Sequence, residues 1–180
     1  TSGFESRKQL EYFVQSRWNM GRQLSTQMKL ATTNRSNDSE RFQNRDYQIQ
    51  QLSIEPQLTW LPSQQFRSIL IYKYLDSKNE LSVEQFNSHD ISLEATYNRN
   101  TTTALRLNTS YILADFQGDA NTPVAFTMLN GLKDGENLFW TLSLDRQLDK
   151  NLRLSISYEG RKTGSNRVVH LGRMQVGAVF

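Results

Sequence analysis

The sequence contains no cysteine, only three prolines and nine glycines, and no long apolar run. Without cysteine, the chain has neither a disulfide framework nor a cysteine-based metal site. No stretch approaches the roughly 18 consecutive apolar residues that a transmembrane helix requires. The 21 basic residues are scattered among 18 acidic ones and the net charge is only +3, so we expect no nucleic-acid partner. At 180 residues, the chain has the length of one ordinary domain.

What the sequence does contain is an alternation of apolar and polar residues with a period of two. The segment LRLSISYE, residues 152–159, is one example. The alternation predicts strands at 7–18, 24–30, 52–60, 66–74, 91–97, 105–113, 138–144, 152–158 and 167–180. A transmembrane β-barrel needs no long apolar run, because only alternate residues of each strand face the lipid. We therefore predict an all-β fold, an antiparallel transmembrane β-barrel of about nine strands in the bacterial outer membrane.

The connections between these strands alternate in length. Short turns are expected at 19–22, 61–65, 98–102 and 148–151, and long polar loops at 32–46, 76–86 and 115–136. This is typical of outer-membrane barrels, whose short turns are periplasmic. The last long loop contains an unusually apolar stretch, residues 124–132. It would fold into the lumen, cap the rim, contact a partner or simply extend the neighbouring strands, and we favour the extension.

The two faces of the predicted strands differ in chemistry. Trp18, Trp60 and Tyr97 lie on the apolar face beside short turns, and we predict that they form a periplasmic aromatic girdle. The charged residues predicted to face the lumen are Glu55, Glu94, Arg106, Arg153, Glu159 and Arg173. They would either line a polar pore that selects solutes by charge or form cross-strand ion pairs. For any single residue we favour the ion pair. A third possibility is the outer surface of a soluble sheet.

Two histidines, His89 and His170, fall near the predicted outer rim. His89 is followed by Asp90, and adjacent residues of a strand point to opposite faces, which argues against a catalytic dyad. We interpret both as solvated loop histidines. No phosphate loop, metal cluster or catalytic spacing is present in the sequence. We therefore expect no catalytic residue, no cofactor, no metal and no enzymatic activity.

The last strand carries a resemblance to a known class of proteins. Its sequence RMQVGAVF resembles the C-terminal signal strand of bacterial outer-membrane β-barrels. The segments 126–145 and 152–162 look like the closing hairpins of large barrels from Bacteroidota. The resemblance implies that the barrel-assembly machinery reads an insertion signal made of Met174, Val176, Ala178 and Phe180. Ala178 departs from the pattern, since an aromatic residue often stands there.

The number of strands bears on the completeness of the barrel. If the ninth strand ends at the periplasmic side, the first strand must also run toward the periplasm, because odd-numbered strands share a direction. Bacterial single-chain barrels, however, have even strand counts. We therefore expect residues 1–180 to be one domain, the C-terminal part of a larger barrel. The alternative is a complete small barrel of eight strands. The expected function is transport, secretion or assembly across the outer membrane, with the lipid bilayer, the assembly machinery and other subunits of a complex as partners. The first rival hypothesis is a soluble or surface β-sandwich that binds a ligand, and the second is an outer-membrane enzyme.

Overall fold

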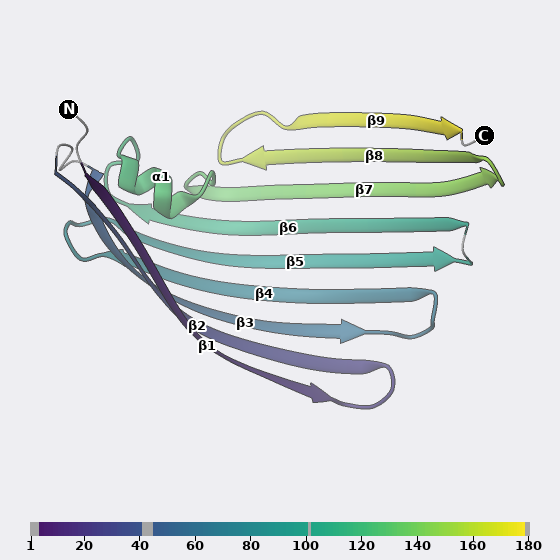
Figure 1. Cartoon of the computed structure of the whole chain (residues 1–180), viewed down its shortest axis with the longest axis horizontal. Coiled ribbons are helices and arrows are strands. Elements are labelled where there is room, and N and C mark those ends of the chain that lie inside the picture. The colour runs from purple at the N-terminus through teal and green to yellow at the C-terminus, as the bar shows by residue number, and fades with distance from the viewer. Residues whose placement is uncertain (1–3, 41–44, 101, 179–180) are drawn as a thin grey trace.

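The computed structural model describes residues 4–40, 45–100 and 102–178, which form nine strands and one short helix (Figure 1). The strands are β1 (Glu5–Asn19), β2 (Leu24–Ser39), β3 (Tyr47–Trp60), β4 (Phe66–Asn79), β5 (Gln85–Arg99), β6 (Thr103–Gln117), β7 (Gly135–Asp149), β8 (Leu152–Thr163) and β9 (Val169–Ala178). The helix α1 (Pro123–Leu129) lies between β6 and β7. Each strand pairs antiparallel with the next, and β1 and β9 are the edges of the single sheet. The predicted all-β antiparallel fold is confirmed.

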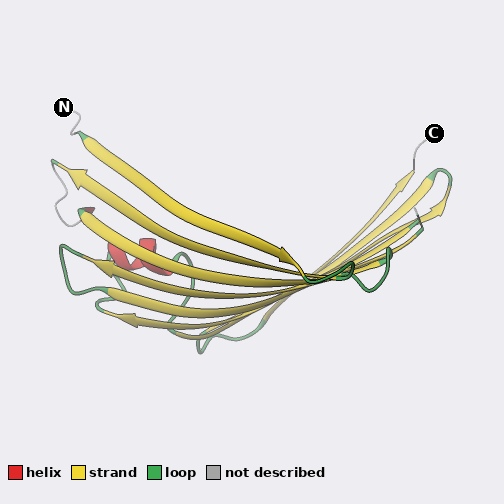
Figure 2. Ribbon diagram, turned by 90° about the horizontal axis from the view of Figure 1, so that it is seen from below, coloured by secondary structure: helices red, strands yellow, loops and turns green. Residues whose placement is uncertain are grey.

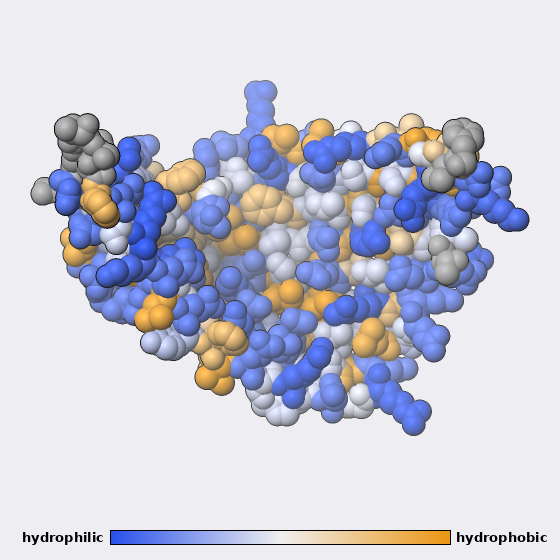
Figure 3. Space-filling view, in the orientation of Figure 1, coloured by the Kyte–Doolittle hydropathy of each residue, from blue (hydrophilic) through white to orange (hydrophobic). Residues whose placement is uncertain are grey.

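The sheet is curled into a trough, and α1 lies on its concave side (Figure 2). In Figure 1 the turns that join β1 to β2, β3 to β4, β5 to β6 and β7 to β8 lie at the right-hand end of the strands. The other connections lie at the left-hand end, here called the long-loop end: they include the long segment that carries α1 and the shorter ones at 80–84 and 164–168. The view onto the concave side shows a largely hydrophilic surface (Figure 3). The period-two alternation therefore gives the sheet a polar concave face and an apolar convex face.

The convex face presents an apolar band of the height that a bilayer requires. On β6 the band runs from Leu105 to Leu113, which are 37% and 43% exposed. Nine residues span about 30 Å along a strand, and a tilt of about 40° reduces this to roughly 23 Å, close to the band of an outer-membrane barrel. A soluble protein rarely exposes so much contiguous apolar surface. In the described residues, no helix is both long and apolar enough to cross a membrane.

Several strands continue past this band at the long-loop end, so the predicted loop boundaries were partly wrong. Strand β2 extends to Ser39, and β4, β5 and β6 also enter the segments that we expected to be loops. The convex face of β2 is polar beyond Leu30, with Asn34, Ser36 and Asp38 in the positions that face outward. The sheet therefore projects beyond the lipid at this end.

Candidate functional site

The concave face carries the six charged residues that the sequence assigned to a lumen. Glu94 and Arg106 lie an even number of residues from Phe86 and Ala114, which pack against α1, so they point to the concave side. The strand pairings place the whole set on this face: Glu55, Glu94, Arg106, Arg153, Glu159 and Arg173. A role for any of them in solute selection stays a prediction.

The register of the sheet sorts the charges on this face into rows that cross the strands. Arg67, Arg106 and Arg173 fall in one row, linked through pairings with threonine and serine residues on the intervening strands. Glu94 and Glu159 fall in the next row. Two residues along a strand separate the rows by about 7 Å. The concave wall thus sets a basic row beside an acidic row, an arrangement that the sequence reasoning missed.

Ion pairs connect some of these charges across neighbouring strands. Their side chains are between 33% and 65% exposed, so each pair contributes at most about 1 kcal/mol to stability. The ion-pair alternative therefore describes some of these charges, and the pore-lining alternative stays a prediction. The pairs are Arg106–Asp145 (2.7 Å), Arg173–Glu159 (3.4 Å) and Lys29–Glu11 (3.4 Å).

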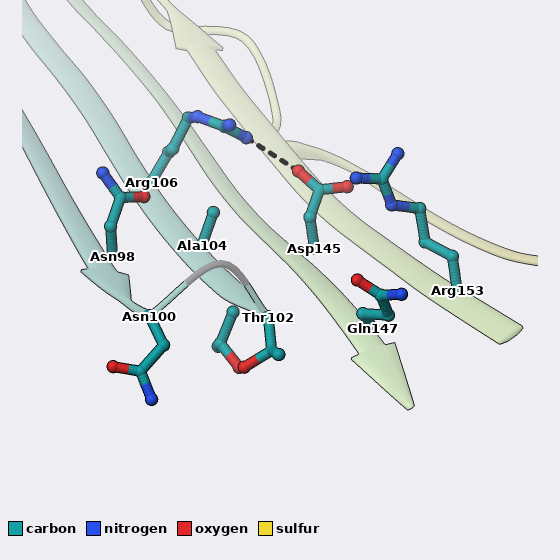
Figure 4. Close-up of a pocket in the computed structure, with 9 residues that line it drawn as sticks. Asn98, Asn100, Thr102, Ala104, Arg106, Asp145, Gln147 and Arg153 are labelled. Atoms are coloured by element: carbon teal, nitrogen blue, oxygen red, sulfur yellow. Dashed lines mark hydrogen bonds and ion pairs between the residues drawn. The ribbon is translucent and has the colours of Figure 1, made fainter. Parts of the chain in front are cut away.

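A polar hollow of about 290 Å³ lies on the concave face beside the short turns (Figure 4). Asp145 accepts hydrogen bonds from Arg106 and from Ser155, both at 2.7 Å. Arg153 extends its guanidinium toward the same carboxylate from the other side, and Gln147 lies nearby (Figure 4). One carboxylate between two guanidinium groups leaves this hollow with a net positive charge.

Helix α1 lies against the concave wall at the opposite, long-loop end. Val124, Ala125, Met128 and Leu129 are buried on one side of the helix, whereas Phe126 is 75% exposed on the other. The wall meets the helix with apolar residues, among them Ile49, Phe86 and Ala114. The expectation that this stretch extends the strands was wrong, because only by folding inward does it bury its apolar side. Folding toward the lumen was one of the alternatives.

The sequence around α1 fixes both ends of the helix. The Thr122 hydroxyl accepts a hydrogen bond from the Ala125 amide at 3.1 Å, and Pro123 occupies the first turn, where its missing N–H costs nothing. Asn130 ends the helix in the left-handed conformation, with φ of 48°. Gly131 follows with φ of 86°, a backbone conformation that residues with a side chain rarely adopt. These signals turn the chain back toward β7.

Asn137 fastens the returning segment to the sheet. Its side chain is completely buried. The amide group donates to the carbonyls of Lys133 (2.7 Å) and Gly135 (3.1 Å), and the side-chain oxygen accepts from the Lys133 N–H at 3.0 Å. Two of the three bonds are to the backbone of Lys133 in the loop that carries α1, and the third is to Gly135 at the start of β7, so Asn137 ties the end of this loop to the sheet.

The loop between β4 and β5 supports the same region from the side. Glu84 is only 7% exposed and packs against Gly118, where an added Cβ would approach the Glu84 Cγ to 2.9 Å. Burial raises the pKa of the Glu84 carboxyl, but hydrogen bonds from Ser82 and Asn79 outweigh it and lower the pKa below its ordinary value. Glu84 is therefore an ionised, hydrogen-bonded anchor between two loops.

On the convex face, the residues of the predicted girdle lie at the short-turn ends of their strands. Trp18, Trp60 and Tyr97 are 55%, 48% and 38% exposed. Trp60 also meets the Phe66 ring edge to face, with centroids 5.9 Å apart. This placement suits an aromatic belt at the membrane interface, and the girdle itself stays a prediction.

The interpretation of the two histidines as loop residues was wrong. His89 lies within β5 and His170 within β9. Each accepts or donates a hydrogen bond at Nδ1 with a tyrosine hydroxyl, Tyr72 or Tyr158, at 2.7 Å. The apolar alternation of β5 ends at Ile91, so it did not mark residue 89 as part of a strand. Asp90 points to the concave face, as its adjacency to His89 requires.

In strand β9 the described residues of the predicted insertion signal, Met174, Val176 and Ala178, share one face. Met174 and Val176 are 73% and 57% exposed on the convex side, and Ala178 pairs with Leu152. Phe180 lies outside the described residues, and the signal stays a prediction. In residues 4–40, 45–100 and 102–178, no three potential metal-ligating side chains gather.

A curled antiparallel sheet with an apolar convex band and a water-exposed, charged concave face defines the class: this is the fold of a bacterial outer-membrane β-barrel. Among solved structures, the chain is similar to OmpT, an outer-membrane protein of Vibrio cholerae. The form expressed in the outer membrane matches with a TM-score of 0.63 and 11% identity, over 86% of this chain and 46% of that one. A mutant of OmpT that lacks loop L8 matches with a TM-score of 0.63 and 11% identity, over 96% and 53%.

A trimer form of the same protein matches with a TM-score of 0.60 and 13% identity, over 96% of this chain and 55% of that one. The chain thus spans about half the length of the OmpT structures that it matches. No protein-family model matches the chain, and none of the curated proteins is significantly similar to it. The expected location, the bacterial outer membrane, is confirmed by this fold. The narrower resemblance to Bacteroidota barrels stays a prediction.

The expectation that the chain is not an enzyme does not stand. The matches to OmpT establish a barrel fold at 11% identity and partial coverage, without establishing an activity. A fold of this kind hosts enzymes as well as porins, and activity depends on the site that a particular chain places on it. The lack of a catalytic spacing in the sequence was therefore insufficient ground for that expectation.

Proposed function

We propose that this chain forms part of the wall of a water-filled passage for small polar solutes across the outer membrane, with α1 narrowing its outer mouth. The observation that carries the proposal is the position of α1, which packs on an apolar patch of an otherwise charged and hydrated concave face. Of transport, secretion and assembly, transport fits this arrangement best, because the wall offers separate charged rows to small solutes.

A pair of matched substitutions on α1 tests the proposal. Val124→Asp places a carboxylate in the apolar cluster, where its burial would be costly, so the helix should leave the wall. Phe126→Asp places the same carboxylate on the exposed side of the same helix. In liposome-swelling assays with small sugars, we expect the protein purified from outer membranes to admit solute. Val124→Asp should raise the rate of swelling at least twofold, because the mouth is no longer narrowed, and Phe126→Asp should change it less. A barrel that admits no sugar, or equal effects of the two variants, would contradict the proposal.

We further propose that the nine strands are one part of a larger closed barrel. Because every neighbouring pair is antiparallel, β1 and β9 run in the same direction. Direct closure would require a parallel pair, whereas an odd number of further strands restores the alternation. This chain covers 46–55% of the OmpT structures, which is consistent with a full barrel that has about as many further strands as the nine described here. The mass of the mature protein tests this: a value near 20.9 kDa, the mass of this chain, would refute it.

Strand β9 is our proposed recognition segment for the barrel-assembly machinery. Its convex residues alternate with polar residues that face the concave side, and the strand is an edge of the sheet. Val176→Asp should reduce the amount of heat-resistant folded barrel in outer membranes, whereas Gln175→Asp, on the other face, should not. Equal loss in both variants would indicate a general defect of the strand.

A further inference from the structure

The two histidines of the chain sit in two pairs of identical construction. His89 on β5 bonds Tyr72 on β4, and His170 on β9 bonds Tyr158 on β8, each at 2.7 Å through Nδ1. In both pairs the histidine lies two residues farther toward the long-loop end than the residue paired with the tyrosine, which is Ile91 or Gly172. The same diagonal contact, with the same atoms, therefore occurs twice on one sheet.

Each imidazole also has a second aromatic neighbour. Tyr74 lies beside His89, with ring centroids 5.1 Å apart, and Trp140 lies beside His170 at 5.8 Å. The Trp140 indole covers Gly160, directly opposite His170, where an added Cβ would come within 2.0 Å of it. Both histidines nevertheless remain exposed on the convex surface.

Both pairs lie where the apolar band of the convex face ends. Beyond them the convex face becomes polar: Lys162 approaches Glu136 at 3.8 Å, and the Tyr111 hydroxyl donates to the same carboxylate at 3.2 Å. Long loops mark the outer side of such a barrel. The two imidazoles are therefore at the level of the headgroups of the outer leaflet, with apolar residues below them and charged residues above.

The tautomer of each imidazole determines what the ring offers to its surroundings, and both rings are assigned the tautomer in which the tyrosine hydroxyl donates to Nδ1. When the hydroxyl donates to Nδ1, the neutral ring carries its proton on Nε2, and a protonated ring carries one there as well. In both states Nε2–H is a donor directed away from the tyrosine. A donor fixed at headgroup level is complementary to the anionic oxygen of a phosphate.

We propose that the Tyr72–His89 and Tyr158–His170 pairs bind the phosphate groups of lipids in the outer leaflet through the Nε2–H of each histidine. The occupant is a lipid headgroup, because the pairs are continuous with the lipid-facing apolar band and lie at its outer end. This inference needs only the barrel fold and does not depend on solute transport. It assigns to the outer rim a recognition of headgroups beyond the general affinity of aromatic residues for the interface.

The test uses the protein purified from outer membranes in non-ionic detergent, with ¹⁵N-labelled histidine. His89→Gln and His170→Gln assign the imidazole signals. Dioleoyl phosphatidic acid is added to the micelles at constant pH, and dioleoylglycerol, which has the same chains and no phosphate, is the matched control. We expect the Nε2 resonances of both histidines to shift with phosphatidic acid at least three times as far as with dioleoylglycerol. Equal shifts with the two lipids would overturn the proposal.

Two further experiments distinguish phosphate recognition from a general response to negative charge and test the part that the tyrosines play in it. Oleate supplies negative charge without phosphate, so a shift equal to that with phosphatidic acid would overturn the proposal. Tyr72→Phe should at least halve the shift at His89 and leave that at His170 unchanged, and Tyr158→Phe should do the reverse. Each pair thereby serves as the folding control for the other. If neither substitution changed the lipid-induced shifts, the tyrosines would have no role in binding the phosphate.

Discussion

Replacing Asn137 by alanine should release the loop that carries α1 while leaving the barrel intact. The substitution removes the three hydrogen bonds to the backbone of Lys133 and Gly135, all in a fully buried position. At about 0.5–1.5 kcal/mol for each of the three bonds, the loop loses about 1.5–4.5 kcal/mol of local stability. The loop would then open roughly 10- to 1,600-fold more often, since each 1.4 kcal/mol corresponds to about a factor of ten.

Hydrogen exchange measured by mass spectrometry detects this opening. The Asn130 amide, bonded to the Phe126 carbonyl at 3.1 Å, is a reporter within the loop, and peptides from β8 are the internal reference. Asn166→Ala is the matched control, because Asn166 also contacts Lys133 but only through an exposed side-chain bond of 3.3 Å. If exchange in the loop of Asn137→Ala rose less than threefold, or if β8 accelerated equally, the anchoring role of Asn137 would be refuted.

Three further substitutions and conditions have defined outcomes. Gly160→Ala should destabilise the barrel by about 1–3 kcal/mol in urea unfolding, because the new methyl group overlaps the Trp140 indole, whereas Gly172→Ala meets no atom within 4 Å and should be neutral. Thr122→Ala should accelerate hydrogen exchange in α1 about fivefold, because losing a helix cap usually costs about 1 kcal/mol. Glu84 has a lowered pKa in the folded state, so its contribution is present above the unfolded pKa of about 4.3 and is lost as the pH falls through the folded value. As the pH falls, hydrogen exchange in the loop should therefore accelerate more steeply in the wild-type protein than in Glu84→Gln. Parallel pH profiles of the two proteins would show that the Glu84 carboxylate does not anchor the loop.

The strands could be located from the sequence because a membrane barrel must place apolar residues at alternate positions. The same rule explains where strand prediction failed. Beyond Leu30 the outward residues of β2 meet water, so Asn34 and Ser36 no longer mark the strand, although pairing with β3 continues to Asn37. The ends of strands that project from the lipid carry no alternation, and the sequence made them look like loops.

The candidate site was only partly predictable. Alternation within each strand placed Arg106 and Glu159 on the polar face, but their grouping into a basic and an acidic row depends on the register between strands, which no single strand encodes. The signals for α1 were present: Thr122 before Pro123, and Asn130 before Gly131, are ordinary start and stop signals of a helix. Their meaning became clear only with the apolar wall that the helix covers.

The strict alternation of the two faces also limits how this protein can change by mutation. A single inserted or deleted codon within a strand would turn the rest of that strand over, so that Arg106 or Glu94 would enter the lipid and leucines would line the water. Substitutions that keep the polarity of a position are tolerable, whereas changes of length belong in the turns and loops. Relatives of this chain should therefore differ widely in amino-acid sequence while keeping their strand lengths. This is consistent with a fold that remains recognisable at 11% sequence identity.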